Sequence, residues 1–275
     1  MKKLINNKAK IGIFDSGLGG LFTMKAIAKE LPEYDYVYLG DTKRLPYGSR
    51  SHEVIYQFLK EGVDFLFSKD CAIIIVACNT ASAEALRQIQ KEYLPKAYPD
   101  RKVLGMIVPM TEACNEFKNV GLVATGATIA SGAYPREFKK RNPKTKIIGL
   151  ATPLLVPIVE SGEKKWIKPV LAEYMKFLKN KKIDALLLGC THYAIFKKEF
   201  SVLLPKGVTI ISQDVVVPKK VKNYLSRHKE ISDILSFTKH GGKMEFYVTD
   251  TTTNFQKMAN LWFGKKISIK KVVIE

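Results

Sequence analysis

The chain of 275 residues (31.0 kDa) contains 46% hydrophobic residues, a content that permits one or two buried cores and excludes an intrinsically disordered protein. Its 45 Lys and Arg residues outnumber its 26 Asp and Glu residues and give a formal charge of +19. These basic residues are spread along the sequence without interleaved aromatic residues, which favours a solvated surface over a nucleic-acid site.

The N-terminus, the apolar runs and the cysteines indicate the cellular compartment. Lys2 and Lys3 precede a few apolar residues, but Asn6 and Asn7 interrupt them before a stretch of signal-peptide length develops, so we expect no export signal. All apolar runs are far shorter than the roughly 18 residues of a membrane span. The four cysteines show neither CxxC spacing nor a histidine cluster, which argues against a zinc site and a disulfide framework. We therefore expect a soluble protein of the reducing cytoplasm.

Short apolar runs alternate with amphipathic segments along the chain. Because the runs are continuously apolar, each is expected to be a strand covered on both faces, as in a parallel sheet flanked by helices. The sequence therefore predicts an α/β fold. The predicted strands are Lys10–Asp15, Tyr36–Gly40, Ala72–Cys78, Val103–Val108, Val120–Thr125, Lys146–Leu150, Ala185–Cys190 and Val208–Ser212. The predicted helices include Leu18–Leu31, Ser51–Phe67, Thr80–Tyr93 and Glu163–Leu178.

Residues with distinctive chemistry follow the first two predicted strands, where ligands gather in parallel sheets. In the segment Asp15–Gly20 a carboxylate ends the strand and glycines permit a tight turn, so Asp15 is either a ligand contact or only a helix cap. The glycines do not form GxGxxG, so no dinucleotide site is predicted. In the loop Gly40–Ser49, backbone groups around Tyr47 and Gly48 are candidates to hold a carboxylate, although an ordinary surface turn fits this segment as well.

Two cysteines occur at matching places. Cys78 follows a strand and opens a helix, whose dipole supplies about 0.3–2 kcal/mol of the roughly 2 kcal/mol needed to hold a thiolate at pH 7. Cys190 is followed two residues later by His192, whose imidazolium would add stabilisation, so we expect Cys190 to be the readier thiolate. Cys71 and Cys114 lack such a context and are interpreted as small buried apolar residues.

The repeated context of the two thiols predicts a reaction class. Two thiols in two similar half-molecules that face each other suit the removal of a proton from one face of a carbon atom and its return to the other face, which is a racemisation. A hydrolase with Cys78 as nucleophile and His192 as base is the rival enzyme, but it leaves Cys190 without a role.

The chain resembles the glutamate racemase family along most of its length. The matching segments are Phe14–Gly20, Tyr38–Thr42, Pro46–Gly48, Ala77–Ala83, Ala124–Tyr134, Pro153–Pro157 with Glu160, and Leu188–Tyr193. The resemblance implies interconversion of L- and D-glutamate, the supply of D-glutamate for peptidoglycan synthesis, a homodimer, and no metal, pyridoxal phosphate or nucleotide cofactor. It also implies two α/β domains, residues 1–98 plus 208–275 and residues 99–207, with the active site in the cleft between them.

The resemblance further implies roles for individual residues. Cys190 would take the proton from L-glutamate and Cys78 from D-glutamate, and Asp15 and His192 would assist. An anionic Asp15 opposes a Cys78 thiolate, so we expect Asp15 to pair with the substrate ammonium or with a protonated thiol. The implied substrate-binding residues are Asp15, Ser16, Pro46, Tyr47, Gly48, Asn79, Thr80, Thr125, Glu160, Thr191 and His192.

Two segments depart from the family pattern. Thr152 stands where the family commonly has cysteine, and Ser212–Asp214 replaces the usual Asp-containing turn. Neither change affects the thiols, so we expect activity, with differences in regulation or domain closure. The alternatives to a glutamate racemase are a racemase for aspartate or another acidic amino acid, a cysteine-dependent hydrolase or decarboxylase, and a nucleic-acid-binding protein.

Overall fold

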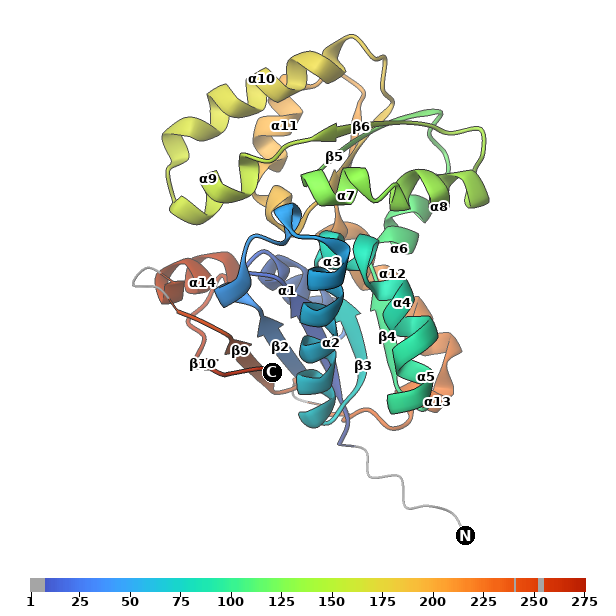
Figure 1. Cartoon of the computed structure of the whole chain (residues 1–275), viewed down its shortest axis with the longest axis vertical. Coiled ribbons are helices and arrows are strands. Elements are labelled where there is room, and N and C mark those ends of the chain that lie inside the picture. Colours follow the sequence, from blue (N-terminus) through green and yellow to red (C-terminus); the bar gives the residue numbers. More distant parts are fainter. Residues whose placement is uncertain (1–7, 240, 252–254) are drawn as a thin grey trace.

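Two parallel sheets, each covered by helices, organise the computed structural model, which describes residues 8–239, 241–251 and 255–275 (Figure 1). They form two α/β domains, as the sequence predicts. Residues 1–7, which contribute to the expectation about export, lie outside the described residues. Within the described part of the chain, no helix is long and apolar enough to cross a membrane.

The larger sheet has six parallel strands in the order β10-β9-β2-β1-β3-β4. Its central strands are almost wholly buried because helices cover both faces. Its strands are β1 (Lys10–Asp15), β2 (Tyr36–Gly40), β3 (Cys71–Val76), β4 (Lys102–Gly105), β9 (Met244–Val248) and β10 (Ile269–Lys271).

The smaller sheet has four parallel strands in the order β6-β5-β7-β8. Its strands are β5 (Asn119–Ala124), β6 (Lys146–Ala151), β7 (Ala185–Gly189) and β8 (Thr209–Ile211). In Figure 1 this sheet and its helices form the upper half of the molecule, above the six-stranded domain.

The helices follow the strands in a βα rhythm. The α-helices are α1 (Gly20–Glu30), α2 (His52–Ser68), α3 (Asn79–Glu84), α4 (Leu86–Gln88), α5 (Leu94–Ala97), α6 (Ile107–Glu112), α7 (Gly126–Ala130), α8 (Ala133–Arg141), α9 (Leu155–Ser161), α10 (Ile167–Lys179), α11 (Lys197–Leu203), α12 (Gln213–Arg227), α13 (Lys229–Ser232) and α14 (Phe255–Phe263). The shorter helical segments are the 3-10 helices η1 (Thr42–Arg44), η2 (Tyr47–Ser49), η4 (Lys164–Trp166) and η5 (Thr191–Phe196) and the π-helix η3 (Ile89–Tyr93).

The structure corrects three details of the sequence prediction. The helix expected at Thr80–Tyr93 is a succession of α3, α4 and η3. The strand expected at Val103–Val108 already ends at Gly105, because α6 begins at Ile107. Strands β9 and β10 are absent from the prediction because neither is a continuously apolar run. Met244–Val248 contains a glutamate, and the edge strand Ile269–Lys271 contains two lysines.

The sheets also place the crossings between the domains. Strand β4 pairs with β3 in the larger sheet, and β8 pairs with β7 in the smaller one. The boundaries expected at residues 98/99 and 207/208 therefore differ from the sheets by one strand each. The expected boundary at 98/99 precedes β4, and the one at 207/208 precedes β8. The chain leaves the larger sheet only after Gly105 and the smaller sheet only after Ile211.

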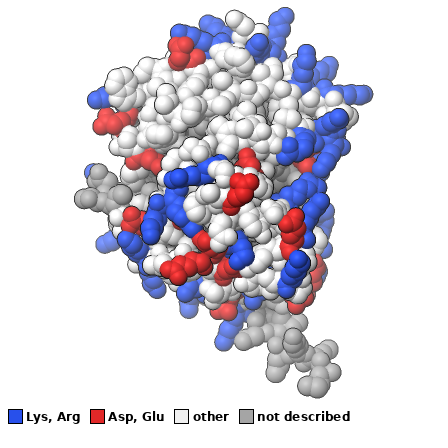
Figure 2. Space-filling view, viewed as in Figure 1, with Lys and Arg blue, Asp and Glu red and all other residues white. Residues whose placement is uncertain are grey.

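The surface charge is dispersed. On the face shown in Figure 2, Lys and Arg side chains lie among Asp and Glu side chains over the lower, six-stranded domain, and much of the upper domain is uncharged. Several of these charged side chains form ion pairs at exposed sites of the molecule, such as Lys176 with Glu173 and Lys222 with Glu30. Exposed pairs of this kind contribute little to stability and chiefly solvate the surface.

Candidate active site

A cavity of about 120 Å³ lies between the two domains, at the carboxyl ends of strands from both sheets. Both Cys78, which follows β3, and Cys190, which follows β7, line it. The complete lining is Ser16, Leu45, Pro46, Tyr47, Gly48, Ser49, Cys78, Asn79, Thr80, Thr125, Gly126, Thr152, Pro153, Val156, Pro157, Cys190, Thr191 and His192.

A second cavity, of about 460 Å³, is larger but differs in chemistry. It lies among α3, α4, α6, α8 and α12, and none of the described residues that line it is a cysteine, histidine or aspartate. The smaller cavity is the candidate active site because two cysteine thiols and a histidine imidazole, which are groups that transfer protons in enzymes, converge on it.

Cys78 is the N-cap of α3, as predicted for a cysteine that opens a helix. Its Sγ accepts a hydrogen bond from the Ala81 N–H (3.4 Å) and donates one to Ser16 Oγ (3.4 Å). Burial and the nearby charge of Asp15 raise the pKa of Cys78 to about 12, although the bonds to Ser16 and Ala81 oppose this. Cys78 is therefore held as a protonated thiol in this structure.

Cys190 has different surroundings. Its Sγ lies 3.8 Å from Nδ1 of His192, and Nε2 of the same imidazole lies 3.0 Å from Oε1 of Glu160. Burial by itself would lower the pKa of His192, but the hydrogen bonds to Cys190 and Glu160 and their charges outweigh it and raise this pKa well above its ordinary value. The His192 imidazole therefore links the Cys190 sulfur to the Glu160 carboxylate.

Asp15 lies behind the cavity wall, at the end of β1. Its Oδ2 accepts hydrogen bonds from the Gly17 N–H (3.1 Å) and the Gly20 N–H (3.0 Å), so one oxygen serves as the helix cap. Its Oδ1 has no hydrogen-bond partner among the described residues. Burial raises the pKa of the Asp15 carboxyl, and the charge of His192 opposes that rise. Asp15 thus combines a cap with one free, buried acceptor.

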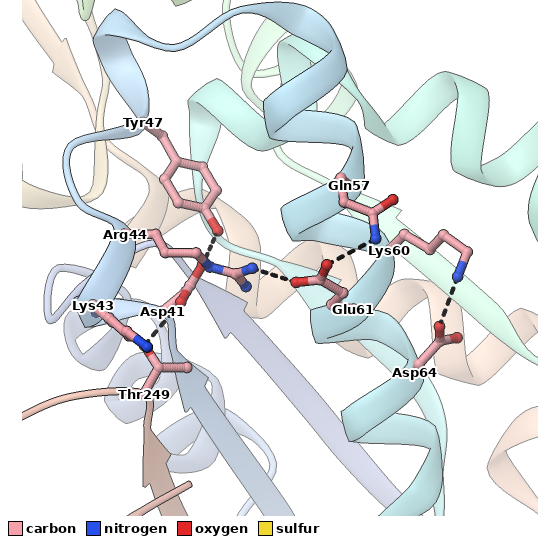
Figure 3. Close-up of polar contacts among 9 residues, drawn as sticks. All are labelled: Asp41, Lys43, Arg44, Tyr47, Gln57, Lys60, Glu61, Asp64 and Thr249. Atoms are coloured by element: carbon pink, nitrogen blue, oxygen red, sulfur yellow. Dashed lines mark hydrogen bonds and ion pairs between the residues drawn. The ribbon is translucent and has the colours of Figure 1, made fainter. Parts of the chain in front are cut away.

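The loop between β2 and α2 forms one side of the cavity and is anchored from behind (Figure 3). The Tyr47 hydroxyl donates a hydrogen bond to Asp41, which also accepts one from Arg44 Nε (2.6 Å) and one from Thr249 Oγ1 (2.8 Å). Arg44 in turn pairs with Glu61 of α2. The Tyr47 hydroxyl is therefore directed away from the cavity, and the loop offers chiefly its backbone there.

Hydroxyl groups from both domains meet beside the loop. Thr80 Oγ1 lies 2.9 Å from Thr125 Oγ1 and 3.2 Å from Thr128 Oγ1. Thr125 also caps α7. A Cβ on Gly48 would lie only 2.8 Å from Thr125 Cβ, so the absence of a side chain at Gly48 lets the loop approach the second domain closely.

The structure brings together most of the residues expected from the sequence. Asp15 and Glu160 do not line the cavity: Asp15 bonds to Gly17 and Gly20, and Glu160 contacts His192, which does line it. Sequence reasoning did not propose several wall residues, of which Thr152 follows β6 and obeys the same strand-end rule as the cysteines. The other wall residues that were not proposed are Leu45, Ser49, Gly126, Pro153, Val156 and Pro157.

Comparisons with known proteins identify the family. The sequence model of the family described as Asp/Glu/Hydantoin racemase matches residues 21–216. The glutamate racemase of Aquifex aeolicus is 39% identical over 266 residues, which cover 95% of this chain and 96% of the relative. The crystal structure of Francisella tularensis glutamate racemase in complex with D-glutamate superposes with a TM-score of 0.87 at 32% identity and covers 98% of both chains.

A second solved structure gives the same result. A glutamate racemase isoform from Bacillus anthracis superposes with a TM-score of 0.88 at 30% identity, over 97% of this chain and 98% of that one. The chain therefore belongs to the Asp/Glu/hydantoin racemase family and, within it, to the glutamate racemases, which are amino-acid isomerases.

Proposed function

We propose that this chain interconverts L- and D-glutamate without a cofactor, with Cys78 and Cys190 as its two acid/base residues. The observation that carries the proposal is that two buried thiols, one from each domain and each at the end of a central strand, line one cavity. An acid and a base contributed by facing domains can act on the two faces of one carbon atom.

We infer the order of the two proton transfers from the surroundings of the thiols. In the L to D direction the Cys190 thiolate removes the α-proton, and the electron pair of the broken C–H bond stays on the α-carbon, delocalised into the carboxylate. The Cys78 thiol then delivers its proton to the opposite face. The products are D-glutamate, a Cys190 thiol and a Cys78 thiolate, and the D to L direction is the reverse of these steps.

The polar groups of the wall supply the substrate contacts. We assign the two carboxylates and the ammonium to Ser16, to the backbone of Pro46–Gly48, to Asn79 and to the hydroxyls of Thr80, Thr125 and Thr191. Asp15 lies behind the wall, so we assign its free Oδ1 to the Cys78 thiol and not to the substrate ammonium. Glu160 acts through His192, which it orients, rather than on the substrate.

The biological setting follows from the same proposal. We propose a cytoplasmic homodimer that supplies D-glutamate for peptidoglycan synthesis. We also propose that the two domains comprise residues 1–105 with 212–275, and residues 106–211, as the sheets divide the chain.

The test is circular dichroism of L- and D-glutamate incubated with the metal-free protein under reducing conditions. Wild type should abolish the optical signal of either enantiomer, and Cys78→Ser and Cys190→Ser should each lower kcat by a factor on the order of 1,000. Cys114→Ser is the matched control, because burial raises the pKa of that thiol to about 12 as well but it lies outside the cavity.

Each outcome has a distinct meaning. Racemisation of aspartate but not glutamate would keep the two-thiol mechanism and change the substrate. Retained racemisation in Cys190→Ser would refute the two-thiol mechanism. Loss of activity in Cys114→Ser alone would place the chemistry elsewhere.

A further inference from the structure

A chain of buried side-chain hydrogen bonds runs behind Cys78 and joins the two domains. The Tyr134 hydroxyl donates to Asn79 Oδ1 (2.7 Å), and Asn79 Nδ2 donates to Gln213 Oε1 (2.7 Å). Gln213 Nε2 donates to Thr23 Oγ1 (2.6 Å) and to the carbonyl oxygen of Ala77 (3.3 Å). All four polar side chains are almost completely buried, so each bond is made away from water.

The Ala77 carbonyl fixes the direction of the whole chain. A backbone carbonyl only accepts, so the part of the Gln213 amide that faces it must be the NH₂ group. The Gln213 oxygen then faces Asn79 and requires the Asn79 NH₂ group, which in turn places the Asn79 oxygen against the Tyr134 hydroxyl. One Asn79 N–H remains unused by this chain, and Asn79 lines the cavity.

Gln213 is well placed to hold the segment that carries the thiol. It bonds to Ala77 on one side of Cys78 and to Asn79 on the other. It is also the first residue of α12, where the chain returns from the smaller sheet to the larger domain. Tyr134, at the other end, belongs to α8 of the second domain.

We propose that Gln213 is a positioning residue: its amide holds Ala77–Asn79 around Cys78 and orients Asn79 so that its remaining N–H donates to a substrate carboxylate. The proposal rests on the proposed glutamate racemase function. Without Gln213, the Asn79 amide could rotate and turn its oxygen toward the substrate carboxylate, which it would repel. The bond from Asn79 Nδ2 to Gln213 Oε1 fixes the amide in the other orientation.

The test is a double-variant cycle on the KM for glutamate, with kcat measured separately. Gln213→Met keeps the length of the side chain but none of its bonds, and it should raise KM about tenfold with a smaller fall in kcat. Tyr134→Phe should raise KM about threefold. Since both act through the one Asn79 amide, KM of the double variant should stay within about twofold of the Gln213→Met value rather than reach the product of the two factors.

Two further variants keep the test decisive. Gln213→Leu likewise removes every bond of the amide, so it should raise KM about as much as Gln213→Met, and it replaces that variant in the cycle if the latter does not fold. Gln90→Met is the matched control, because Gln90 also donates to a backbone carbonyl, that of Val103, but lies outside the active-site cavity. Its KM should equal that of wild type.

The outcomes separate the two proposals. A wild-type protein that leaves glutamate unchanged refutes the proposed function. Wild-type activity combined with an unchanged KM in the folded Gln213 variants, or with KM factors that multiply in the double variant, refutes only the positioning role of Gln213.

Discussion

The two cysteines occupy equivalent places in the two domains and yet have opposite electrostatic surroundings. Cys78 caps α3 beside a carboxylate, and its pKa is raised to about 12 by burial and by Asp15. Cys190 lies beside His192, whose own pKa is raised well above the ordinary value by Cys190 and Glu160 in spite of burial. The fold repeats the strand-end position, whereas the neighbouring side chains differ: a carboxylate lies near Cys78 and an imidazole lies beside Cys190.

This asymmetry has a mechanistic use. A two-base racemase needs one base and one acid at the start of each turnover, and different surroundings suit the two thiols to these different roles. In the proposed mechanism, with Cys190 as base and Cys78 as acid, the resting protein is prepared for L-glutamate. After one such turnover the protons would have been exchanged, and the protein would be prepared for D-glutamate.

His192→Asn tests the difference between the two cysteines most directly. Loss of the imidazolium should lower kcat about 100-fold, and more in the L to D direction, in which Cys190 is the base. The change in kcat/KM must be equal in the two directions, because the enantiomers have equal free energies. Circular dichroism from each enantiomer, with α-deuterated substrates, measures the difference. His228→Asn, which changes a half-exposed histidine paired with Glu230, is the control. Equal kcat losses in both directions would show that His192 serves both thiols.

Gly19→Ala tests whether close contact between the domains is needed at Cys190. A Cβ there would lie 2.4 Å from Thr191 Oγ1 and 2.8 Å from His192 Nδ1, closer than packed atoms approach. The second domain must therefore retreat, and we expect kcat/KM to fall by a factor on the order of 30. Steady-state kinetics measures this, and Gly149→Ala, whose Cβ would meet only the flexible Ile129 side chain, is the comparison. Wild-type kinetics in Gly19→Ala would mean that this contact is not needed during turnover.

Glu160→Gln tests the same difference through the pH dependence of kcat/KM. Glu160 raises the pKa of His192, so its replacement should lower that pKa, move the alkaline limb of kcat/KM to lower pH and reduce kcat about tenfold. The same sign holds for stability. A raised folded-state pKa stabilises the fold below the unfolded-state pKa of about 6.5, and this contribution is lost as pH rises through the folded value. Glu163→Gln, an exposed partner of Lys165, is the control. An unmoved alkaline limb would assign that limb to another group.

The sequence predicted those parts of the site that depend on local pattern. Cys78 and Cys190 follow continuously apolar strands, and a strand end followed by a helix start is visible in a few residues. Pairings between distant residues were not visible. Thr249 reaches Asp41 across 208 positions, and Gln213 was noted only as a departure from the family pattern. Packing of the folded domains decides such contacts, and no local pattern encodes them.

Tyr47→Phe tests the loop between β2 and α2, on the Cys78 side of the cavity. This loop is held by buried hydrogen bonds, and not by an ionisable side chain paired with the Cys78 thiol. The hydroxyl bonds to Asp41 and is directed away from the cavity, so its loss should leave kcat near the wild-type value. It should raise KM about threefold and lower the free energy of unfolding by about 1 kcal/mol, because Asp41 keeps its bonds to Arg44 and Thr249. Kinetics and urea unfolding measure the two effects. A large fall in kcat with unchanged stability would instead place the hydroxyl in contact with the substrate, and the loop would then belong to the chemistry as directly as His192 does.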